Sequence, residues 1–327
     1  MARQVSSSQQ LLQPAPEQIA QVHLALLSWY ASAKRVLPWR ATADPYAILV
    51  SEIMLQQTQV ERVLPKYHQF LETFPTLVEL ANASTAEVIS IWVPLGYNKR
   101  AVSLQNIARQ VIAEYNGQLP DTIVELLKLK GIGRYTAGAI ACFAYHQQVA
   151  TVDTNIYRVL HRVFLGLEHP EPQLSTEAMF TFADRLLPNG EAYNWHQGLM
   201  DLGATICTSA NPQCARCPLQ QCCKAYQELS EQSLFPSGAV LRQLRKVAEK
   251  KAPYATQPFT SSNRYFRGRT IAHLRNLPAG ATVALGELGP ILKADFQIED
   301  LPWLEKIITG LQRDGLVVWT ESGVKLP

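Results

Sequence analysis

The sequence predicts an all-α body followed by a small helical unit at the C-terminal end. Apolar residues at helical spacing dominate up to about Gln227, and alternating β-branched residues are scarce. The chain has 327 residues, enough for two domains, and its 47% hydrophobic content suits a globular core. No apolar run approaches the roughly 18 residues of a membrane span, so no membrane association is expected.

The first residues, MARQVSSSQQLLQPAPEQ, contain one early arginine and no apolar stretch. This is not the pattern of a secretory signal, so we expect a disordered tail over 1–16 and a cytoplasmic protein. A net charge of +3 does not by itself indicate a nucleic-acid-binding protein, although an average can hide a local patch.

Helix signals follow in order along the body of the chain. Asp44 and Pro45 favour a helix start in DPYAILVSEIMLQQTQVERVLPKYHQFLETF. STAEVISIWVPLGYNKRAVSLQNIARQVIAEYNG predicts two helices joined at Pro94–Gly96 and closed by Gly117. LPDTIVELLKLKGIGRYTAGAIACFAYH predicts a helix after Asp121, a tight KGIG connection and another helix.

The stretch LKGIGRYTAGA has the form of a helix–hairpin–helix. Gly131 and Gly133 flank Ile132, and glycine permits the left-handed backbone of a tight turn. Bare amide groups beside a helix N-terminus can bind a DNA phosphate without reading sequence. On this stretch alone, an ordinary turn between two helices is an equal alternative.

Two carboxylates and a run of cysteines occupy notable positions. Glu52 lies on a helix that is otherwise apolar around it, and Asp153 lies just before a helix in TVDTNIYRVLHRVF. Taken alone, Glu52 could be an exposed helix carboxylate and Asp153 a plain N-cap. Five of the six cysteines fall between Cys207 and Cys223. In a cytosolic chain so dense a group indicates metal ligation, with a structural disulfide pair as the alternative.

The composition shifts to Gln, Ser, Lys and Pro near Glu228–Pro258, which predicts a linker over 228–262. Eight Lys or Arg and one acid stand between Gly238 and Arg269, so this strip is either a solvated linker or a surface for a polyanion. Beyond it, three helical segments and a hairpin predict a winged-helix-like domain over 263–327. A protein-docking module would give the same pattern.

Together these motifs resemble a known superfamily. A helix–hairpin–helix, an aspartate 20 residues after its second glycine, and Cys-x6-Cys-x2-Cys-x5-Cys resemble the iron–sulfur DNA glycosylases. LPWR, DPYAILVSEIMLQQTQV, LGY, VDTN and LMDLGATICT narrow the resemblance to the adenine DNA glycosylase (MutY-type) branch, over about Leu37 to Cys223. It implies a two-lobed glycosylase domain over 17–227. A six-helix lobe of about 39–148 would face a cluster-bearing lobe of 17–38 with 149–227.

The resemblance also implies roles for individual residues. Glu52 matches the acid that protonates the target purine on its five-membered ring, and Asp153 the carboxylate that stabilises the oxocarbenium-like sugar. Asn155 matches the residue that orients sugar and water, Arg40 lies at the base-pocket position, and Gln57 matches the glutamine inserted into the base stack. The remaining DNA-binding candidates are Gln56, Thr58, Tyr97, Asn98, Gly131, Ile132 and Gly133.

The chemistry is consistent with two carboxyl groups of different proton affinity. A neutral purine is a poor leaving group until it is protonated, and the departing base leaves positive charge on the sugar. Burial would raise the pKa of Glu52 and keep it an acid. The target atom is inaccessible in a stacked duplex, so the nucleotide must flip out.

Tyr135 bears on the reaction type. Lyase relatives of the endonuclease III kind carry at this position a lysine that forms a Schiff base with the sugar. The tyrosine therefore implies monofunctional hydrolysis that leaves an abasic site. Lys130 is either a substitute amine or, as its position favours, a surface phosphate contact.

Two departures bear on the substrate. The family often has LGYY, whose second tyrosine wedges beside the base opposite the target, and Asn98 replaces it here. The family also commonly carries a Nudix-like C-terminal domain that recognises 8-oxoguanine, and the tail here is too short for one. We expect removal of adenine opposite 8-oxoguanine or guanine. The alternatives are another base, such as thymine opposite guanine or hypoxanthine, or a lesion-binding protein without turnover.

The resemblance selects Cys207, Cys214, Cys217 and Cys223 as ligands of a [4Fe-4S] cluster and leaves Cys222 spare. Zinc bound by four cysteines is the chief alternative on spacing alone. The expected partner is double-stranded DNA with a mismatched or damaged base, bound by a monomer associated with the nucleoid.

Overall fold

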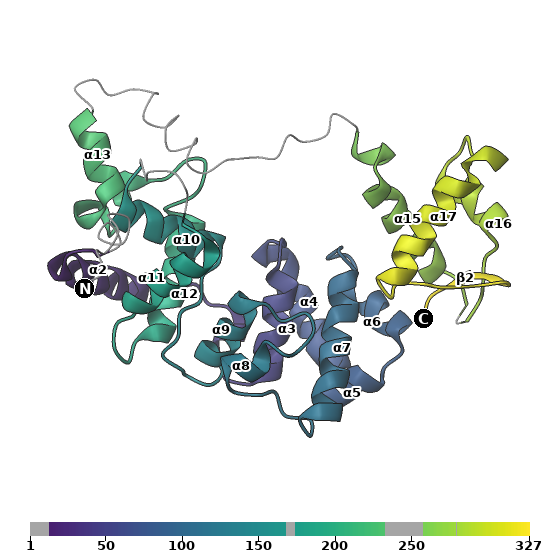
Figure 1. The fold of residues 1–327 in the computed structure, drawn as a ribbon, viewed down its shortest axis with the longest axis horizontal. Helices are drawn as coiled ribbons and strands as arrows, with labels where there is room; N and C mark the ends of the chain where they lie inside the picture. The colour runs from purple at the N-terminus through teal and green to yellow at the C-terminus, as the bar shows by residue number, and fades with distance from the viewer. Residues whose placement is uncertain (1–12, 168–173, 233–257, 279) are drawn as a thin grey trace, which may run out of the picture. The chain divides into compact units, whose positions relative to one another are not determined.

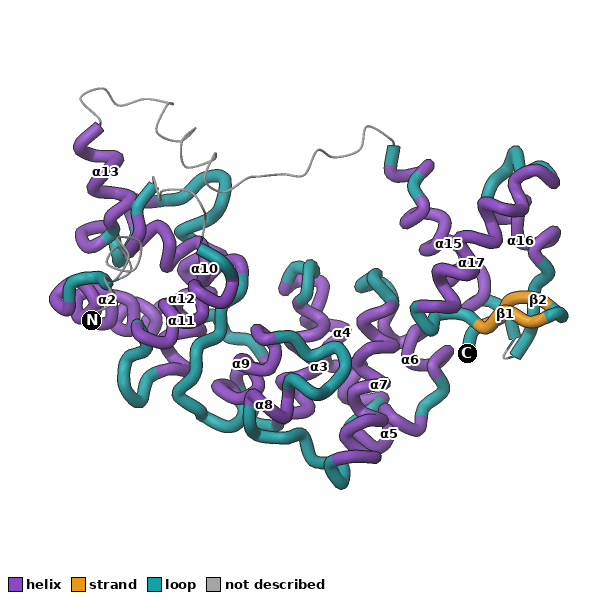
Figure 2. Tube along the Cα trace, viewed as in Figure 1, coloured by secondary structure: helices purple, strands orange, loops and turns teal. Residues whose placement is uncertain are grey.

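A computed structural model describes residues 13–167, 174–232, 258–278 and 280–327 (Figures 1 and 2). The regular structure of this described part is nearly all helix, as predicted, with one two-stranded sheet. Most of the predicted tail and of the predicted linker lies outside the described residues. Where the start of that linker is described, helix α13 (Lys224–Gln232) continues to residue 232.

The chain divides into two compact units, and each is built from several stretches of sequence. Unit 1 comprises 1–45, 121–123 and 133–252, and unit 2 comprises 46–120, 124–132 and 253–327. The two-lobe boundaries expected from the resemblance stay a prediction.

Unit 1 is a helical bundle in which α12 packs against both α2 and α10. Its core contains the fully buried side chains of Leu26, Phe180 and Trp195. Gly198 lets α12 approach α2 closely, because an added Cβ would lie 3.3 Å from Leu26 and Tyr30. The helices are α2 (Pro16–Ala33), η1 (Pro38–Arg40), α9 (Arg134–Phe143), α10 (Thr154–Leu160), η2 (His161–Leu165), α11 (Thr176–Arg185), α12 (Ala192–Thr205), η3 (Cys214–Arg216), η4 (Gln220–Cys222) and α13.

The first part of unit 2 is a second bundle in which α5 and α6 pack on α7. Thr76 and Ser84 cap α5 and α6 by accepting hydrogen bonds from the third helical amide, as N-cap residues commonly do. Helix α3 begins at Pro45 as predicted. The helices are α3 (Pro45–Leu55), α4 (Val60–Thr73), α5 (Leu77–Asn82), α6 (Thr85–Trp92), α7 (Lys99–Glu114) and α8 (Ile123–Leu126).

The C-terminal part of unit 2 has the predicted order of three helices and a hairpin. The strand pair β1–β2 is antiparallel with Trp319 opposite Val324, and an isolated bridge joins Val283 to Val324. The core of this part continues into the first part of the unit through Ile89 and Val102. The elements are η5 (Phe259–Ser261), α15 (Asn263–Arg275), α16 (Leu285–Leu292), η6 (Ile298–Asp300), α17 (Leu301–Arg313), β1 (Val318–Thr320) and β2 (Gly323–Lys325).

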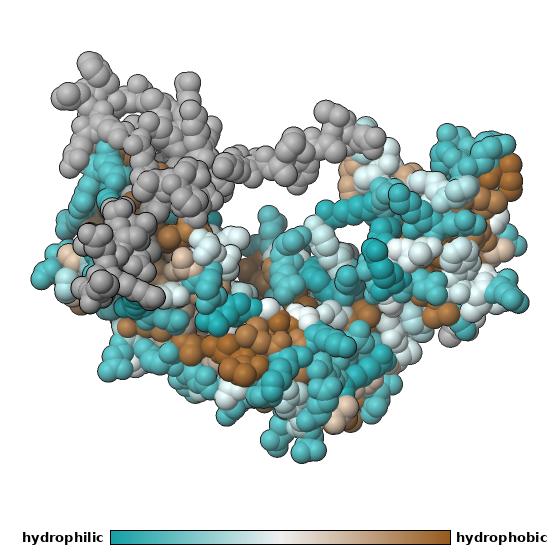
Figure 3. All heavy atoms as spheres, in the orientation of Figure 1, coloured by the Kyte–Doolittle hydropathy of each residue, from teal (hydrophilic) through white to brown (hydrophobic). Residues whose placement is uncertain are grey.

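The face drawn in Figure 3 is mostly hydrophilic, with local apolar patches. Among the described residues, we find no helix that combines the length and the apolar character needed to span a bilayer.

Candidate functional site

Helix α3 buries Glu52. The Glu52 side chain is 6% exposed, and its neighbours Ser51 and Ile53 are 1% and 2% exposed. The sequence alternative of an exposed helix carboxylate is therefore wrong.

Arg100, on the first turn of α7, holds the C-terminal end of α3. Its guanidinium donates to the carbonyl oxygens of Ile53 (3.2 Å) and Met54 (2.9 Å) and to that of Gln56. It also donates to Thr58 Oγ1 (3.0 Å). Burial lowers the pKa of Arg100 to about 10, so it stays charged at neutral pH. One cation thus satisfies the carbonyl groups that the end of a helix leaves without partners.

The loops that Arg100 joins carry two residues in the left-handed backbone region. Gln57 has φ +57° and Tyr97 has φ +49°, values that side-chain-bearing residues seldom adopt. Trp92 closes the second loop by donating from Nε1 to the Gly96 oxygen at 3.0 Å. Tyr97 is 42% exposed and Asn98 is the N-cap residue of α7. The exposed aromatic side chain in LGYN is therefore Tyr97, and the wedge role of the family's second tyrosine, which Asn98 replaces, stays a prediction.

An open groove of about 890 Å³ within unit 2 collects most of the predicted DNA-binding residues. Its first wall comes from the ends of α3 and α7 and from the hairpin. Its second wall comes from the C-terminal part of the unit. The predicted residues that line it are Gln56, Gln57, Tyr97, Asn98 and Gly131.

The predicted hairpin is present, and its two glycines differ. Gly131 has φ +109°, and a Cβ there would collide with Ser103 Oγ, so this position requires glycine. Gly133 has φ −94° and serves as the N-cap of α9, so the expectation of a left-handed backbone is wrong there. Ile132 is buried and its amide donates to Leu129 O at 3.1 Å. Lys130 is exposed, which agrees with a surface contact.

In unit 1, Asp153 both caps α10 and belongs to a polar chain. Its Oδ1 accepts from the Ile156 amide at 2.7 Å, and its Oδ2 accepts from Asn155 Nδ2 at 3.1 Å. Burial raises the pKa of the Asp153 carboxyl, against the hydrogen bonds from Ile156 and Asn155 that lower it. A cavity of about 360 Å³ opens beside it, lined by Thr154, Tyr157 and others. Asp153 is therefore the N-cap residue of α10, as the alternative in the sequence analysis expected. The cap uses only Oδ1, and the second carboxylate oxygen accepts from Asn155.

The segment that leads to Asp153 is fixed by a buried histidine. The Thr151 amide donates to His196 Nε2 at 2.7 Å, which places the ring proton of the neutral imidazole on Nδ1. Burial lowers the pKa of His196 to about 3. The Ala150 amide donates to Asp184 Oδ1 at 2.8 Å. His196 on α12 and Asp184 on α11 thus bind the backbone just before Asp153 and fix its position.

Arg158 connects this carboxylate to the cysteine loop. Its Nη2 donates to Asn155 Oδ1 and to Gly203 O, both at 2.8 Å, and its Nε donates to Cys207 O at 2.9 Å. Gly203 is required for this approach, because a Cβ would lie 2.8 Å from Asn155 Cβ. The cysteines are far from Asp153 in sequence, yet one arginine links the two regions.

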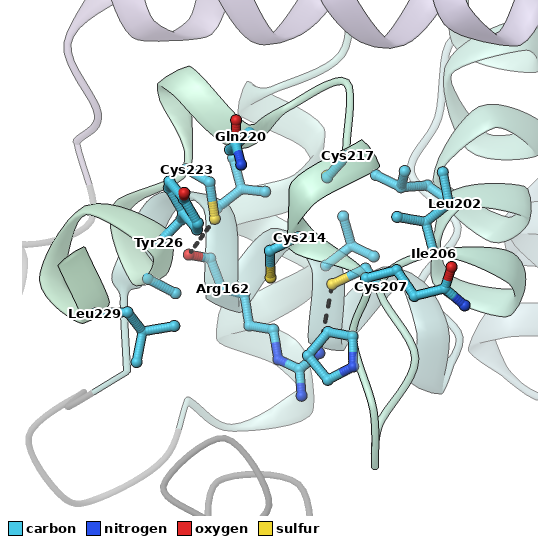
Figure 4. A pocket seen from close by; sticks show the side chains of 15 residues that line it. Arg162, Leu202, Ile206, Cys207, Cys214, Cys217, Gln220, Cys223, Tyr226 and Leu229 are labelled. Carbon is cyan, nitrogen blue, oxygen red and sulfur yellow. Dashed lines mark hydrogen bonds between the residues drawn. The ribbon is translucent and has the colours of Figure 1, made fainter. Parts of the chain in front are cut away.

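Four cysteines line one small apolar cavity (Figure 4). They are Cys207, Cys214, Cys217 and Cys223, the four that the resemblance selected, and none is in a disulfide.

The cavity holds these thiols in a largely apolar environment. Burial raises the pKa of Cys217 and of Cys223 to about 12, and Arg162 Nη1 lies 3.4 Å from Cys207 Sγ. Within the described residues, no three His, Cys, Asp or Glu side chains are placed to hold one metal ion. Cys222 instead lies in the core with its Sγ 3.5 Å from Leu219 O.

Comparison with known proteins places the chain in a family. Residues 50–182 match the family described as HhH-GPD superfamily base excision DNA repair protein. An adenine DNA glycosylase of Mycolicibacterium smegmatis is 36% identical over 305 residues, which cover 91% of this chain and 93% of that protein. The chain belongs to the adenine DNA glycosylase family. The human adenine DNA glycosylase is 41% identical over 225 residues, 66% of this chain and 41% of that longer protein.

The fold agrees with this family. A solved thermostable thymine-DNA glycosylase superposes with a TM-score of 0.61 at 31% identity, covering 65% of this chain and 98% of that one. The all-α helix–hairpin–helix glycosylase fold predicted from sequence is confirmed.

In this adenine DNA glycosylase family member, Arg40 takes part in a buried ion-pair network. Both of its terminal nitrogens donate to Asp201, at 2.8 and 2.9 Å, and Arg35 Nε donates to the same carboxylate at 2.7 Å. Asp201 is 1% exposed, and the two arginines hold the pKa of its carboxyl below the usual value despite burial. The base-pocket role of Arg40 stays a prediction, and its described contacts are structural.

Sequence reasoning missed Arg100, Arg158, His196 and Asp201, because each acts through partners distant in the chain. Asp201 had a signal, since it stands in LMDLGATICT, one of the motifs that carry the resemblance. Tyr135 lies on the first turn of α9 and packs against the unit 1 core. Glu52 belongs to unit 2 and Asp153 to unit 1, and each is described within its own unit.

Proposed function

We propose that this protein removes adenine opposite 8-oxoguanine or guanine in double-stranded DNA, by hydrolysis of the N-glycosidic bond. The observation that carries the proposal is the similarity to adenine DNA glycosylases over 91% of the chain, together with a buried carboxyl at Glu52. Base flipping must precede the reaction, because the bond is inaccessible inside the duplex.

Glu52 is the proposed acid. Protonation of a ring nitrogen turns adenine into a neutral leaving group, and the pair of electrons from the broken bond stays with the base. The burial of Glu52 on α3 supports this role, since it shields the carboxyl from bulk water.

Asp153 is the proposed stabiliser of the sugar cation that remains. Its hydrogen bond from Asn155, itself held by Arg158, fixes the carboxylate in one orientation. Water then adds to the sugar, and Asn155 is the proposed residue that orients it. Tyr135 cannot form a Schiff base, so the product is an abasic site in an intact strand.

The four cysteines are proposed to hold a [4Fe-4S] cluster. Cys207, Cys214, Cys217 and Cys223 would supply its four thiolate ligands, and zinc bound by the same thiolates is the alternative. The cavity of thiols, with Arg162 beside Cys207, fits a cluster of negative charge. The proposed contribution of the bound cluster is to fix the 207–223 loop.

A panel of duplexes tests the substrate. Each carries one mismatch, namely adenine opposite 8-oxoguanine, guanine or cytosine, thymine opposite guanine, or hypoxanthine opposite thymine. Released base is measured by chromatography and strand scission with and without alkali. We expect free adenine, and scission only after alkali. Release of thymine or hypoxanthine without adenine would instead support the alternative substrates.

Replacement of Glu52 by Gln tests the acid. The variant should lose at least about 100-fold in single-turnover rate, the usual scale of general acid catalysis. Glu61→Gln, an exposed carboxyl on α4, is the control and should retain the rate. Undiminished turnover in Glu52→Gln would refute the assignment, and a wild-type protein that binds lesions without turnover would support the scaffold alternative.

A further inference from the structure

The second wall of the unit 2 groove comes from the C-terminal part of the chain. Residues around η5 and α15 face the ends of α3 and α7 across it. Its cationic and aromatic lining residues there are Phe259, Arg264, Tyr265, Arg267 and Arg269, beside aliphatic residues and Asp314. None of the catalytic roles proposed above involves a residue of this wall.

Most cations of the groove are already engaged. Lys99 and Arg267 both pair with Asp314, at 2.9 and 2.6 Å. Arg269 donates to the backbone oxygens of Leu292 and Ile291, at 3.0 and 2.7 Å.

Arg264 differs from these. Among the residues that the structure describes, no carboxylate pairs with it, and its side chain is exposed. Its guanidinium carbon lies 4.2 Å from the centre of the Tyr97 ring. Stacking of this kind leaves the edge of a guanidinium, with its N–H donors, open to an anion.

Aromatic surface accompanies this charge. Phe259 is 61% exposed and its ring meets that of Tyr265 edge to face at 5.7 Å. Tyr97, across the groove, is 42% exposed. A cationic groove with exposed aromatic side chains is the pattern that proteins use to bind nucleic acid, where phosphates pair with cations and bases stack on rings.

We propose that the C-terminal part, 258–327, is a DNA-binding part of the enzyme rather than a protein-docking module. Arg264 binds a backbone phosphate and steadies Tyr97, while Phe259 and Tyr265 form the apolar side of the same groove. The inference rests on the proposed function only in taking DNA as the substrate. It assigns this short C-terminal part a role in DNA binding.

Charge complementarity selects DNA as the occupant. A groove with five cationic side chains and one carboxylate, Lys99, Arg100, Arg264, Arg267, Arg269 and Asp314, attracts a polyanion. Asp314 neutralises part of that charge, so its removal should act in the opposite direction to removal of Arg264.

The test measures equilibrium binding of the full chain to a duplex with a tetrahydrofuran abasic analogue, which cannot turn over. Fluorescence anisotropy is recorded over a series of NaCl concentrations. Arg264→Ala should raise Kd about tenfold and reduce the slope of log K against log salt by about 1, as for one lost phosphate contact. Arg264→Lys should keep the slope, because the charge remains.

Two further variants give the matched comparisons. Arg313→Ala removes the same charge from the exposed end of α17, outside the groove, and should leave Kd and the slope unchanged. Asp314→Asn should lower Kd by about threefold.

If Arg264→Ala behaves like Arg313→Ala while wild type binds the duplex and releases adenine, this inference is wrong and the proposed function stands. If wild type binds no duplex, the proposed function itself fails.

Discussion

At the scale of single residues, Asp153 serves the fold and the proposed reaction at once. As the N-cap of α10 it satisfies the Ile156 amide, which any good N-cap residue could do. As a carboxylate held in a partly buried site with Asn155, it carries a charge that the fold disfavours, and burial raises its pKa. A charge kept where it is costly is what an electrostatic role would require.

Asp153→Asn separates these two roles. Asparagine caps as well as aspartate, so the variant should be at least as stable at pH 7 while losing about 100- to 1000-fold in single-turnover rate.

The difference in unfolding free energy between Asp153→Asn and the wild type should depend on pH. A raised native pKa means that the Asp153 contribution is fully present below the ordinary value of 3.8 and is lost as pH rises through the native pKa. In urea unfolding, the variant should therefore be more stable than the wild type above the pH at which the native carboxyl titrates. The difference should vanish at lower pH. A variant that is markedly less stable at pH 7 would contradict this account.

His196 predicts a second pH dependence, with the opposite direction. Its native pKa of about 3 lies below the ordinary 6.5, so the unfolded chain gains a proton first as pH falls. Stability from the neutral imidazole is present above pH 6.5 and is lost between pH 6.5 and about 3. One proton contributes at most about 1.4 kcal/mol per pH unit.

His196→Gln should flatten this acid dependence, since an amide oxygen can accept from Thr151 without titrating. Urea unfolding between pH 7 and 4 measures it. The exposed His68→Gln is the control and should retain the wild-type slope. An equal slope in wild type and His196→Gln would contradict the assignment.

At the scale of elements, the end of α3 is held by a residue from another helix. Arg100 satisfies the carbonyl groups of Ile53 and Met54 and joins two loops that carry the strained residues Gln57 and Tyr97. Strained backbone persists only where its surroundings determine it, so Arg100 is a positioning residue for both loops.

Arg100→Ala should lower the free energy of unfolding by about 3 kcal/mol, because it leaves buried carbonyls without donors. Hydrogen exchange at 56–58 and 95–98 should accelerate more than elsewhere in unit 2. Asn106→Ala, on the exposed side of the same helix, is the control and should change neither. Unchanged exchange in these loops would show that other contacts hold them.

At the scale of the whole molecule, the C-terminal part shares a hydrophobic core with α6 and α7. Ile89 and Val102 belong to the same buried cluster as Leu288, Leu304 and Ile308. The groove that we assign to DNA is therefore supported on both walls by one core.

Leu304→Ala should transmit its effect through that core. Truncation of a fully buried leucine costs about 2–5 kcal/mol, and amide exchange in α7 should accelerate together with that in α17. Gln312→Ala, exposed on the same helix, should affect neither. Faster exchange confined to the C-terminal part would show that the two parts unfold independently.

The sequence by itself determined the helices, the caps and the motifs of this protein. Pro45, Ser84 and Gly117 act on their immediate neighbours, and the four cysteines proposed as ligands stand close together in the chain, where the family resemblance could select them. The family followed from the order of such local motifs, and the comparisons confirmed it.

Only the tertiary structure decided which polar groups meet over long distances in the chain. The pairs Arg40–Asp201, Thr151–His196 and Arg158–Cys207 join segments at least 45 residues apart. Gly131 and Gly133 flank Ile132 in the same way in the sequence, but Gly131 has φ +109° and Gly133 has φ −94°. The surrounding packing sets this difference. The contact of Arg264 with Tyr97 likewise exists because two helical parts share a core, and no local pattern encodes that juxtaposition.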